Sequence, residues 1–139
     1  MNALVDTSVW SLSLRRRPGD LNHVERSTVG ELTELIAEGR VRLIGLIRQE
    51  VLSGIRNPSQ FEKLRAFLRP FPDVAIDTSD YEAAAQASNQ CMSRGVIVSI
   101  VDALICAVAL SRNCTIFTTD TDFQKHAEIL PIKLHTPRK

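Results

Sequence analysis

The chain has 139 residues, of which 44% are apolar, and a formal net charge of +1 at pH 7. This length and composition indicate one globular domain with a sizeable core and exclude a disordered chain. The small net charge does not by itself require a polyanionic partner, although 13 of the 17 cationic side chains are arginine, which suits bidentate phosphate contacts.

Apolar runs and helical spacing predict the secondary structure. In chain order we expect a strand at 2–6, helices at 7–14 and 23–38, a strand at 41–45, helices at 46–53 and 58–69, a strand at 74–76, helices at 79–94 and 99–111, and strands at 114–117 and 132–134. Two capping boxes, Ser79-x-x-Glu82 and Ser99-x-x-Asp102, mark the starts of the last two helices. Strands alternating with helices predict one α/β domain over residues 1–139 with a mainly parallel sheet.

Cysteine usage and hydropathy indicate where the protein works. The three cysteines show no metal-ligand or redox spacing, and their odd number argues against a closed disulfide framework. No apolar run reaches the roughly 18 residues that a membrane span needs. Asp6 follows the first methionine too closely for a secretory signal. We therefore expect a cytoplasmic protein with buried, reduced thiols and no contact with a membrane.

Four acids stand in apolar surroundings. Asp6 and Asp120 each follow a predicted strand, so both should reach the edge where the strands of a parallel sheet end and ligands bind. Glu50 lies just after the second predicted strand, and Asp102 lies in the first turn of an almost wholly apolar, hence buried, helix. No lysine or arginine stands within four residues of Asp6, Asp102 or Asp120, so the local sequence supplies no ion-pair partner.

Each acid alone has a structural explanation as a helix cap, as half of a capping box, or as a surface acid paired with an arginine. Together they indicate a metal site, because carboxylates that converge on one edge repel one another and a divalent cation removes the conflict. Mg²⁺ and Mn²⁺ prefer oxygen ligands, and at carboxylate sites they serve phosphate chemistry. The hydroxyl residues beside the acids are candidates for orienting them or bound water: Thr7, Ser8, Thr118 and Thr119.

Four motifs in order carry a family resemblance. They are Val5-Asp-Thr-Ser-Val-Trp10, Gln49-Glu-Val-Leu-Ser-Gly54, Val101-Asp-Ala-Leu-Ile-Cys-Ala107 and Thr118-Thr-Asp-Thr-Asp-Phe123. The chain resembles the PIN-domain ribonucleases, specifically the VapC-type toxins of bacterial VapBC toxin–antitoxin pairs. Each motif alone is weak, whereas four in order across almost the whole chain are specific.

The resemblance implies a three-layer α/β/α sandwich and an Mg²⁺- or Mn²⁺-dependent endoribonuclease that inhibits growth. The catalytic acids carried over are Asp6, Glu50, Asp102 and Asp120, and the metal ligands are the same four with Asp122. Asp120 is expected to be the closer ligand of the last pair. Ser99, three residues before the third acid, matches a small polar residue common in the family. The implied partners are a transfer or ribosomal RNA, a VapB-type antitoxin and a second copy of the chain, which would pack on the helices at 58–71 or 79–94.

Other readings remain open on the sequence. A phosphatase-like α/β domain also places an acid after its first strand, but it wants a second acid where Ser8 stands. A catalytically silent RNA-binding module of the same fold would not need four acids. The basic run Arg15-Arg16-Arg17 offers candidate contacts to the RNA backbone, although a solvated loop without function has the same sequence pattern.

Overall fold

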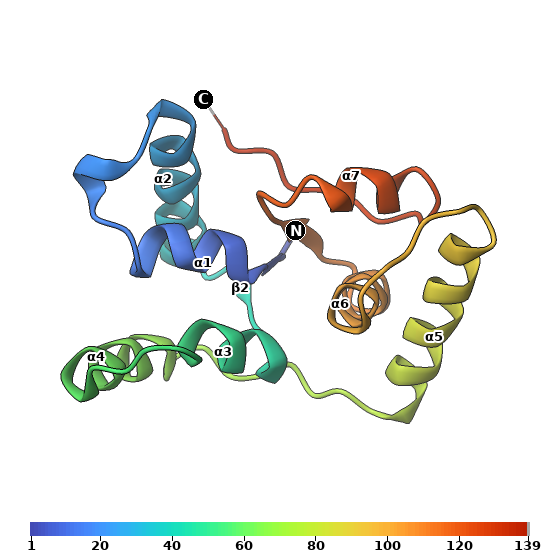
Figure 1. Ribbon diagram of the computed structural model, residues 1–139, viewed down its shortest axis with the longest axis horizontal. Helices are drawn as coiled ribbons and strands as arrows, with labels where there is room; N and C mark the ends of the chain where they lie inside the picture. The colour runs from blue at the N-terminus through green and yellow to red at the C-terminus, as the bar shows by residue number, and fades with distance from the viewer. Residues whose placement is uncertain (139) are drawn as a thin grey trace.

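The computed structural model describes residues 1–138 (Figure 1). Its elements are β1 Ala3–Val5, α1 Thr7–Leu14, the 3-10 helix η1 Pro18–Asp20, α2 His23–Ala37, β2 Val41–Arg42, α3 Gly45–Leu52, α4 Pro58–Leu68, α5 Thr78–Met92, α6 Ile100–Ser111, β3 Thr115–Phe117 and α7 Asp122–Ala127. The helices predicted from the sequence are present, with ends that differ by at most two residues. Helix α7 lies in a segment for which we predicted no element.

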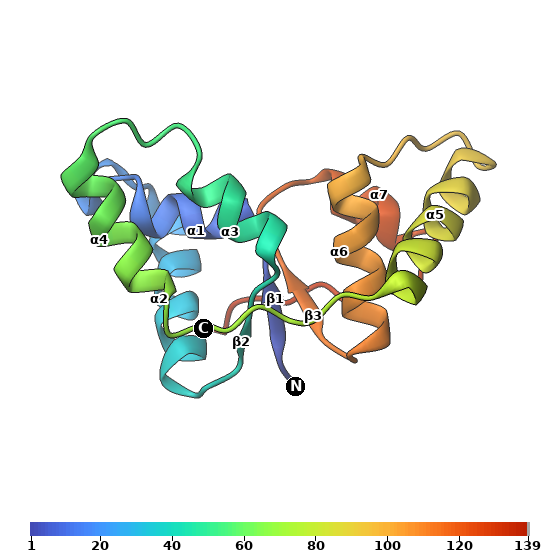
Figure 2. The same cartoon turned by 90° about the horizontal axis from the view of Figure 1, so that it is seen from below.

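The strands form a parallel sheet in the order β2-β1-β3, with β1 buried at its centre. Helices α1–α4 lie on one side of the strands and α5–α7 on the other, which confirms the predicted α/β/α sandwich (Figure 2). This division follows from the right-handed crossovers of parallel strands. The chain passes from β1 to β2 on one side of β1 and later forms β3 on the other side of β1, so the connecting helices lie on opposite faces of the sheet. The strand order therefore reverses between β1 and β3.

The two outer strands that we predicted, at 74–76 and 132–134, are wrong. A single parallel bridge forms at each place: Asp73, just before the first segment, pairs with Leu43, and Leu134 in the second segment pairs with Ile116. Pro72 and Pro131 precede these bridges, and a proline has no N–H group to donate to a ladder. The result is a narrow sheet of three strands with one bridging residue along each edge.

The start of α5 also differs from the prediction. Its capping box joins Asp77 and Asp80 rather than Ser79 and Glu82, so the helix begins one residue earlier. Asp80 is buried and accepts hydrogen bonds from the guanidinium of Arg112 at 2.5 and 2.9 Å. These bonds hold the pKa of the Asp80 carboxyl well below its usual range and tie α5 to the end of α6.

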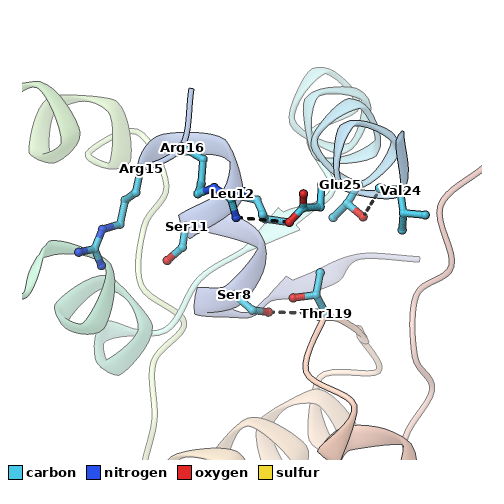
Figure 3. A pocket seen from close by; sticks show the side chains of 9 residues that line it. Ser8, Ser11, Leu12, Arg15, Arg16, Val24, Glu25 and Thr119 are labelled. Atoms are coloured by element: carbon cyan, nitrogen blue, oxygen red, sulfur yellow. Dashed lines mark hydrogen bonds and ion pairs between the residues drawn. The ribbon is translucent and has the colours of Figure 1, made fainter. Parts of the chain in front are cut away.

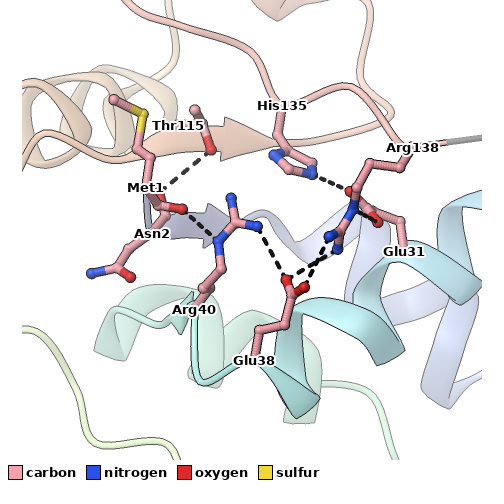
Figure 4. A network of polar contacts seen from close by, with 8 residues as sticks. All are labelled: Met1, Asn2, Glu31, Glu38, Arg40, Thr115, His135 and Arg138. Atoms are coloured by element: carbon pink, nitrogen blue, oxygen red, sulfur yellow. Dashed lines mark hydrogen bonds and ion pairs between the residues drawn. The ribbon is translucent and has the colours of Figure 1, made fainter.

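Charged side chains fasten both ends of the chain to α2 (Figure 4). The buried carboxylate of Glu31 contacts Nε2 of His135 at 2.5 Å and accepts a hydrogen bond from Arg138 at 3.1 Å. Arg138 also donates to both carboxylate oxygens of Glu38. Arg40 donates to the backbone oxygen of the first residue at 2.8 Å and to Glu38 at 3.1 Å. The C-terminal segment is thereby held against α2.

The core confirms two expectations from the sequence. Helix α6 is buried over seven consecutive residues from Ala103 to Ala109, as its apolar composition predicted. The three cysteines are free and buried, and burial raises the pKa of Cys106 to about 12. Within residues 1–138, no helix combines the length and the apolar character that crossing a membrane requires.

Candidate active site

The first acid lies at the point where the strand order reverses, between the carboxyl ends of β1 and β3. Asp6 directly follows β1 and occupies the N-cap position of α1, yet its side chain makes no capping hydrogen bond. Its Oδ2 atom instead accepts hydrogen bonds from Ser8 Oγ at 2.9 Å and Thr118 Oγ1 at 2.8 Å. Asp6 is therefore a buried acid held by hydroxyl groups, and the helix-cap explanation does not account for it.

The same two hydroxyl groups tie the loops after β1 and β3 together. Ser8 Oγ accepts a hydrogen bond from the backbone N–H of Thr119, and Thr118 Oγ1 accepts one from the backbone N–H of Asp120, each at 3.0 Å. The two hydroxyl oxygens lie 3.3 Å apart. Residues more than a hundred positions apart in the chain thus form one bonded unit beneath the Asp6 carboxylate.

Asp102 approaches the same edge from the start of α6. Ser99 Oγ accepts a hydrogen bond from the backbone N–H of Asp102 at 3.0 Å, but no reciprocal bond from the carboxylate to the Ser99 N–H completes the predicted capping box. Burial raises the pKa of Asp102 to about 6, and the charges of Asp6, Asp120 and Asp122 contribute to this increase. A hydrogen bond with Ser99 acts in the opposite direction and lowers the pKa. The three neighbouring acids thus add to the effect of burial on Asp102.

Asp120 and Asp122 lie in the loop after β3 and at the start of α7. Asp120 stands three residues beyond β3 rather than directly after it. Its Oδ1 accepts the backbone N–H of Asp122 at 2.9 Å, which orients the carboxylate. Asp120 acts on the pKa of Asp102 more strongly than Asp122 does. This order favours Asp120 as the acid nearer to the centre of the site.

Glu50 is set apart from the other acids. It lies on α3, is exposed, and accepts a hydrogen bond from Thr7 Oγ1 at 2.9 Å. It does not contribute to the raised pKa of Asp102. Within residues 1–138, no lysine or arginine forms an ion pair with any of the five acids Asp6, Glu50, Asp102, Asp120 and Asp122.

The structure adds a residue that sequence reasoning missed. His126 lies on α7, is 2% exposed, and has its Nε2 atom 3.8 Å from Oδ2 of Asp102. Neither ring nitrogen has a hydrogen-bond partner among residues 1–138. Burial lowers the pKa of His126 and so favours the neutral imidazole, against the charges of Asp122 and Asp120. The signal in the sequence was its position four residues after Asp122, which places both on one face of a helix.

The donor chemistry of the site suits a hard divalent cation. The converging groups are carboxylate oxygens, the ligands that Mg²⁺ and Mn²⁺ prefer, and they have no cationic side chain to balance them. Within residues 1–138, however, no three Asp, Glu, His or Cys side chains are close enough together to form a ready-made metal cluster. The carboxylates are gathered at one edge and spaced as mutually repelling charges.

The basic run after α1 is divided by the fold (Figure 3). Arg16 forms an ion pair with Glu25 at 3.3 Å and donates to the backbone oxygen of Asp20 at 3.1 Å. Arg15 points away from Arg16, toward α3 and α4. Arg15 and Arg16 both line a groove between α1 and α2, whereas Arg17 does not. The three arginines therefore do not form a single patch.

The fold and the acids define an α/β domain with a carboxylate site at the switch point, where the strand order of the sheet reverses. A family model identifies the family of this domain. The model described as "PIN domain" matches residues 3–129, and the chain belongs to this family. Its relatives include "VapC ribonuclease Mb1587" of Mycobacterium bovis and "Ribonuclease VapC11" of Mycobacterium tuberculosis. Each is 30% identical over 130 residues, which cover 91% of this chain and 92% of the relative. Within the PIN family the chain is of the VapC type, which confirms the resemblance drawn from the four motifs.

Solved structures share the fold. FitAcB from Neisseria gonorrhoeae has a TM-score of 0.76 at 24% identity, with 97% of each chain covered. VapBC2 from Rickettsia felis, bound to a DNA fragment from its promoter, has a TM-score of 0.73 at 17% identity, with 99% of this chain and 100% of the other covered. These structures confirm the PIN-like α/β architecture over nearly the whole chain.

Proposed function

We infer that this chain is an endoribonuclease of the VapC class, the toxin of a toxin–antitoxin pair, which hydrolyses phosphodiester bonds in RNA. The observation that carries the proposal is the convergence of Asp6, Asp102 and Asp120 without a cationic partner at the open edge of the sheet. The ribonuclease names of its relatives over nine-tenths of the chain support the same activity.

We propose that the site holds Mg²⁺ or Mn²⁺ and that its ligands come from Asp6, Glu50, Asp102, Asp120 and Asp122. A bound divalent cation supplies two things to such chemistry, an activated water and neutralisation of charge on the phosphoryl oxygens. The carboxylate donors fit the cation, and the charges of Asp6 and Asp120, which add to the effect of burial in raising the pKa of Asp102, are charges that a cation would balance.

The residues of this chain have distinct roles in the proposal. Ser8 and Thr118 fix the Asp6 carboxylate through its Oδ2 atom and leave Oδ1 free to bind. Thr7 orients Glu50 at the rim, where its carboxylate can accept a proton from water. Ser99 sets the start of α6 and hence the position of Asp102. Each hydroxyl thus positions an acid and is not itself a reacting group.

A comparison of two substrates tests the activity. The full-length protein should cleave a single-stranded RNA in Mg²⁺ or Mn²⁺ and leave it intact in EDTA. It should release no phosphate from p-nitrophenyl phosphate. Release of phosphate without RNA cleavage would replace the proposal by a phosphatase-like domain, and RNA binding without cleavage would replace it by a silent RNA-binding module.

The partners in the proposal are an RNA, either transfer or ribosomal, and a VapB-type antitoxin. VapBC2 of Rickettsia felis is a complex of this kind by name. The physical ground for an inhibitor is that an acidic site without substrate presents negative charge that a lysine or arginine can satisfy. An antitoxin segment that carries such a cation would close the site.

We also propose that the chain forms a homodimer through α3, α5 and α6. A cavity of about 310 Å³ between these helices is lined mainly by apolar residues, among them Leu46, Leu104 and Ile100, and Ile100 is 88% exposed. Light scattering should give twice the monomer mass for wild type and the monomer mass for Ile100→Asp. Val24→Asp, which places the same charge on the exposed face of α2, should remain a dimer. A monomeric wild type would reject this interface.

A further inference from the structure

The groove between α1 and α2 opens directly beside the acids. It has a volume of about 560 Å³. It is lined by four hydroxyl residues, two arginines, one acid and two apolar residues: Ser8, Ser11, Thr28, Thr119, Arg15, Arg16, Glu25, Leu12 and Val24. Figure 3 shows Ser8 and Thr119 at one end of this groove and the two arginines at the other.

The acid end of the groove is continuous with the candidate active site. Ser8 lines the groove and also donates to Asp6, while the backbone of Thr119 donates to Ser8. From Ser8 to Arg15 the helix advances seven residues, or about 10 Å. A second cavity, lined by Thr7, Glu50 and Val101, lies between α3 and the start of α6. The groove is therefore one of two hollows that border the candidate active site.

The arginines at the far end differ in how they are engaged. The side chain of Arg15 forms no hydrogen bond or ion pair with any residue between 1 and 138. Arg16 is paired with Glu25 at 3.3 Å, and both side chains are partly exposed. A partly exposed pair of this length is weak and is exchanged for another anion at little cost. Arg15 thus forms part of the groove wall with a guanidinium that is unpaired within residues 1–138 and extends toward α3, and Arg16 supplies a guanidinium that an incoming anion can recruit from Glu25.

We propose that this groove is a subsite for the sugar-phosphate backbone of single-stranded RNA next to the bond that is cut. Guanidinium groups match phosphate in charge and in bidentate geometry, and hydroxyl side chains donate to phosphate and sugar oxygens. Such contacts position a strand without reading its bases. The inference rests on the proposed ribonuclease function, whereas its test measures RNA binding and does not depend on cleavage.

Glu25 is the internal competitor of the incoming phosphate. Its carboxylate neutralises Arg16, so it weakens the attraction of the groove for a polyanion. Glu25 also completes the capping box of α2 with Asn22, accepting the Asn22 backbone N–H at 3.0 Å. Glutamine keeps this hydrogen bond and removes the charge. Glu25→Gln therefore isolates the electrostatic role of the residue from its role in the fold.

Binding of a 5′-fluorescein-labelled 20-nucleotide RNA, followed by anisotropy in EDTA over a range of salt concentrations, tests the subsite. Arg15→Gln should weaken binding roughly tenfold and reduce the salt slope by about 0.7 log unit, the value for one lost contact to a single strand. Glu25→Gln should tighten binding roughly twofold to fivefold. Arg94→Gln, a matched control at the end of α5 on the other side of the molecule, should behave as wild type.

Arg17→Gln separates the groove from a diffuse basic loop. If RNA binds in the groove, Arg17→Gln should lower the RNA affinity less than Arg15→Gln does, because Arg17 does not line the groove. Equal losses for the two variants would overturn the proposal in favour of a solvated basic loop. Unchanged RNA affinity in Arg15→Gln would overturn it as well and would leave the groove to a protein partner. Wild-type protein that binds RNA in this pattern but never cleaves it would reject the proposed function and retain the subsite.

Discussion

Asp6→Asn should lower the rate of RNA cleavage by roughly a hundredfold to a thousandfold, the scale expected when a site loses a group that stabilises the transition state electrostatically. Asparagine has the same shape as aspartate and can still accept the hydrogen bonds of Ser8 and Thr118, so the fold should persist. What is lost is the negative charge that would bind a divalent cation at this edge. Single-turnover cleavage with saturating Mn²⁺ measures the effect, and circular dichroism with a melting curve reports on the fold.

A graded series separates the acid from the groups that hold it. Thr118→Val removes the hydroxyl that donates to Asp6. It should lower the cleavage rate roughly tenfold to a hundredfold, as the loss of a group that hydrogen-bonds a metal ligand does. Thr118→Ser restores the hydroxyl and should recover most of the rate. Asp122→Asn should lower the cleavage rate less than Asp120→Asn, because Asp120 has the larger electrostatic effect on Asp102. Asp20→Asn in η1 is the surface control.

Two outcomes would contradict this assignment. Near wild-type cleavage by Asp6→Asn would show that the reaction does not need the negative charge of Asp6. Asp6 would then not be a ligand of the cation. Equal losses for Thr118→Val and Thr118→Ser would show that Thr118 acts through packing and not through its hydroxyl. The reverse order for Asp120 and Asp122 would exchange their positions relative to the cation.

What the sequence predicted well was local. The strand before Asp6, the buried helix that carries Asp102, and the strand before Asp120 follow from apolar patterns of a few residues each. The rule that ligands bind where strand order reverses then placed these acids at one edge. The four motifs added the family, which composition and spacing did not supply.

What the sequence did not predict depends on contacts between distant segments. His126 borders Asp102 only because α7 packs beside α6, and nothing near His126 in the sequence indicates that neighbour. The sequence does not distinguish the three arginines of the basic loop, whereas in the structure Glu25 of α2 forms an ion pair with Arg16 alone. At the start of α5 two overlapping capping patterns competed, and Asp77 with Asp80 formed because Arg112 holds Asp80 from another helix.

The second large effect concerns the stability of the metal-free protein. Asp102 has a pKa of about 6 in the folded protein, raised from 3.8 by burial and by the charges of Asp6, Asp120 and Asp122. A raised pKa of an acid means that the folded state binds a proton more tightly than the unfolded chain. The free energy of unfolding should therefore fall as pH rises from about 4 to about 6 and then level off, with a penalty of about 3 kcal/mol fully present above pH 6.

Asp102→Asn should remove this penalty. In EDTA at pH 7 the variant should melt at a higher temperature than wild type, although most changes in buried helices destabilise. Part of the gain is offset, because a negative charge near a helix N-terminus contributes about 0.3 to 1 kcal/mol that asparagine lacks. At pH 4, where the wild-type carboxyl is mostly protonated, the two proteins should melt within a few degrees of each other. Melting curves at the two pH values give this difference directly.

Metal should close most of the gap in stability between the two proteins. Mn²⁺ at a hundred times its dissociation constant should stabilise wild type by about 2.7 kcal/mol through mass action, and it should stabilise Asp102→Asn much less. If Asp102 served only the start of α6, asparagine would lower the melting temperature in EDTA and Mn²⁺ would change neither protein. That result would disprove a shared carboxylate site, because the charges that raise the pKa of Asp102 are the same ones that a cation would bring together. Stability in EDTA and in Mn²⁺ therefore tests, without any RNA, whether the acids at the switch point form one site.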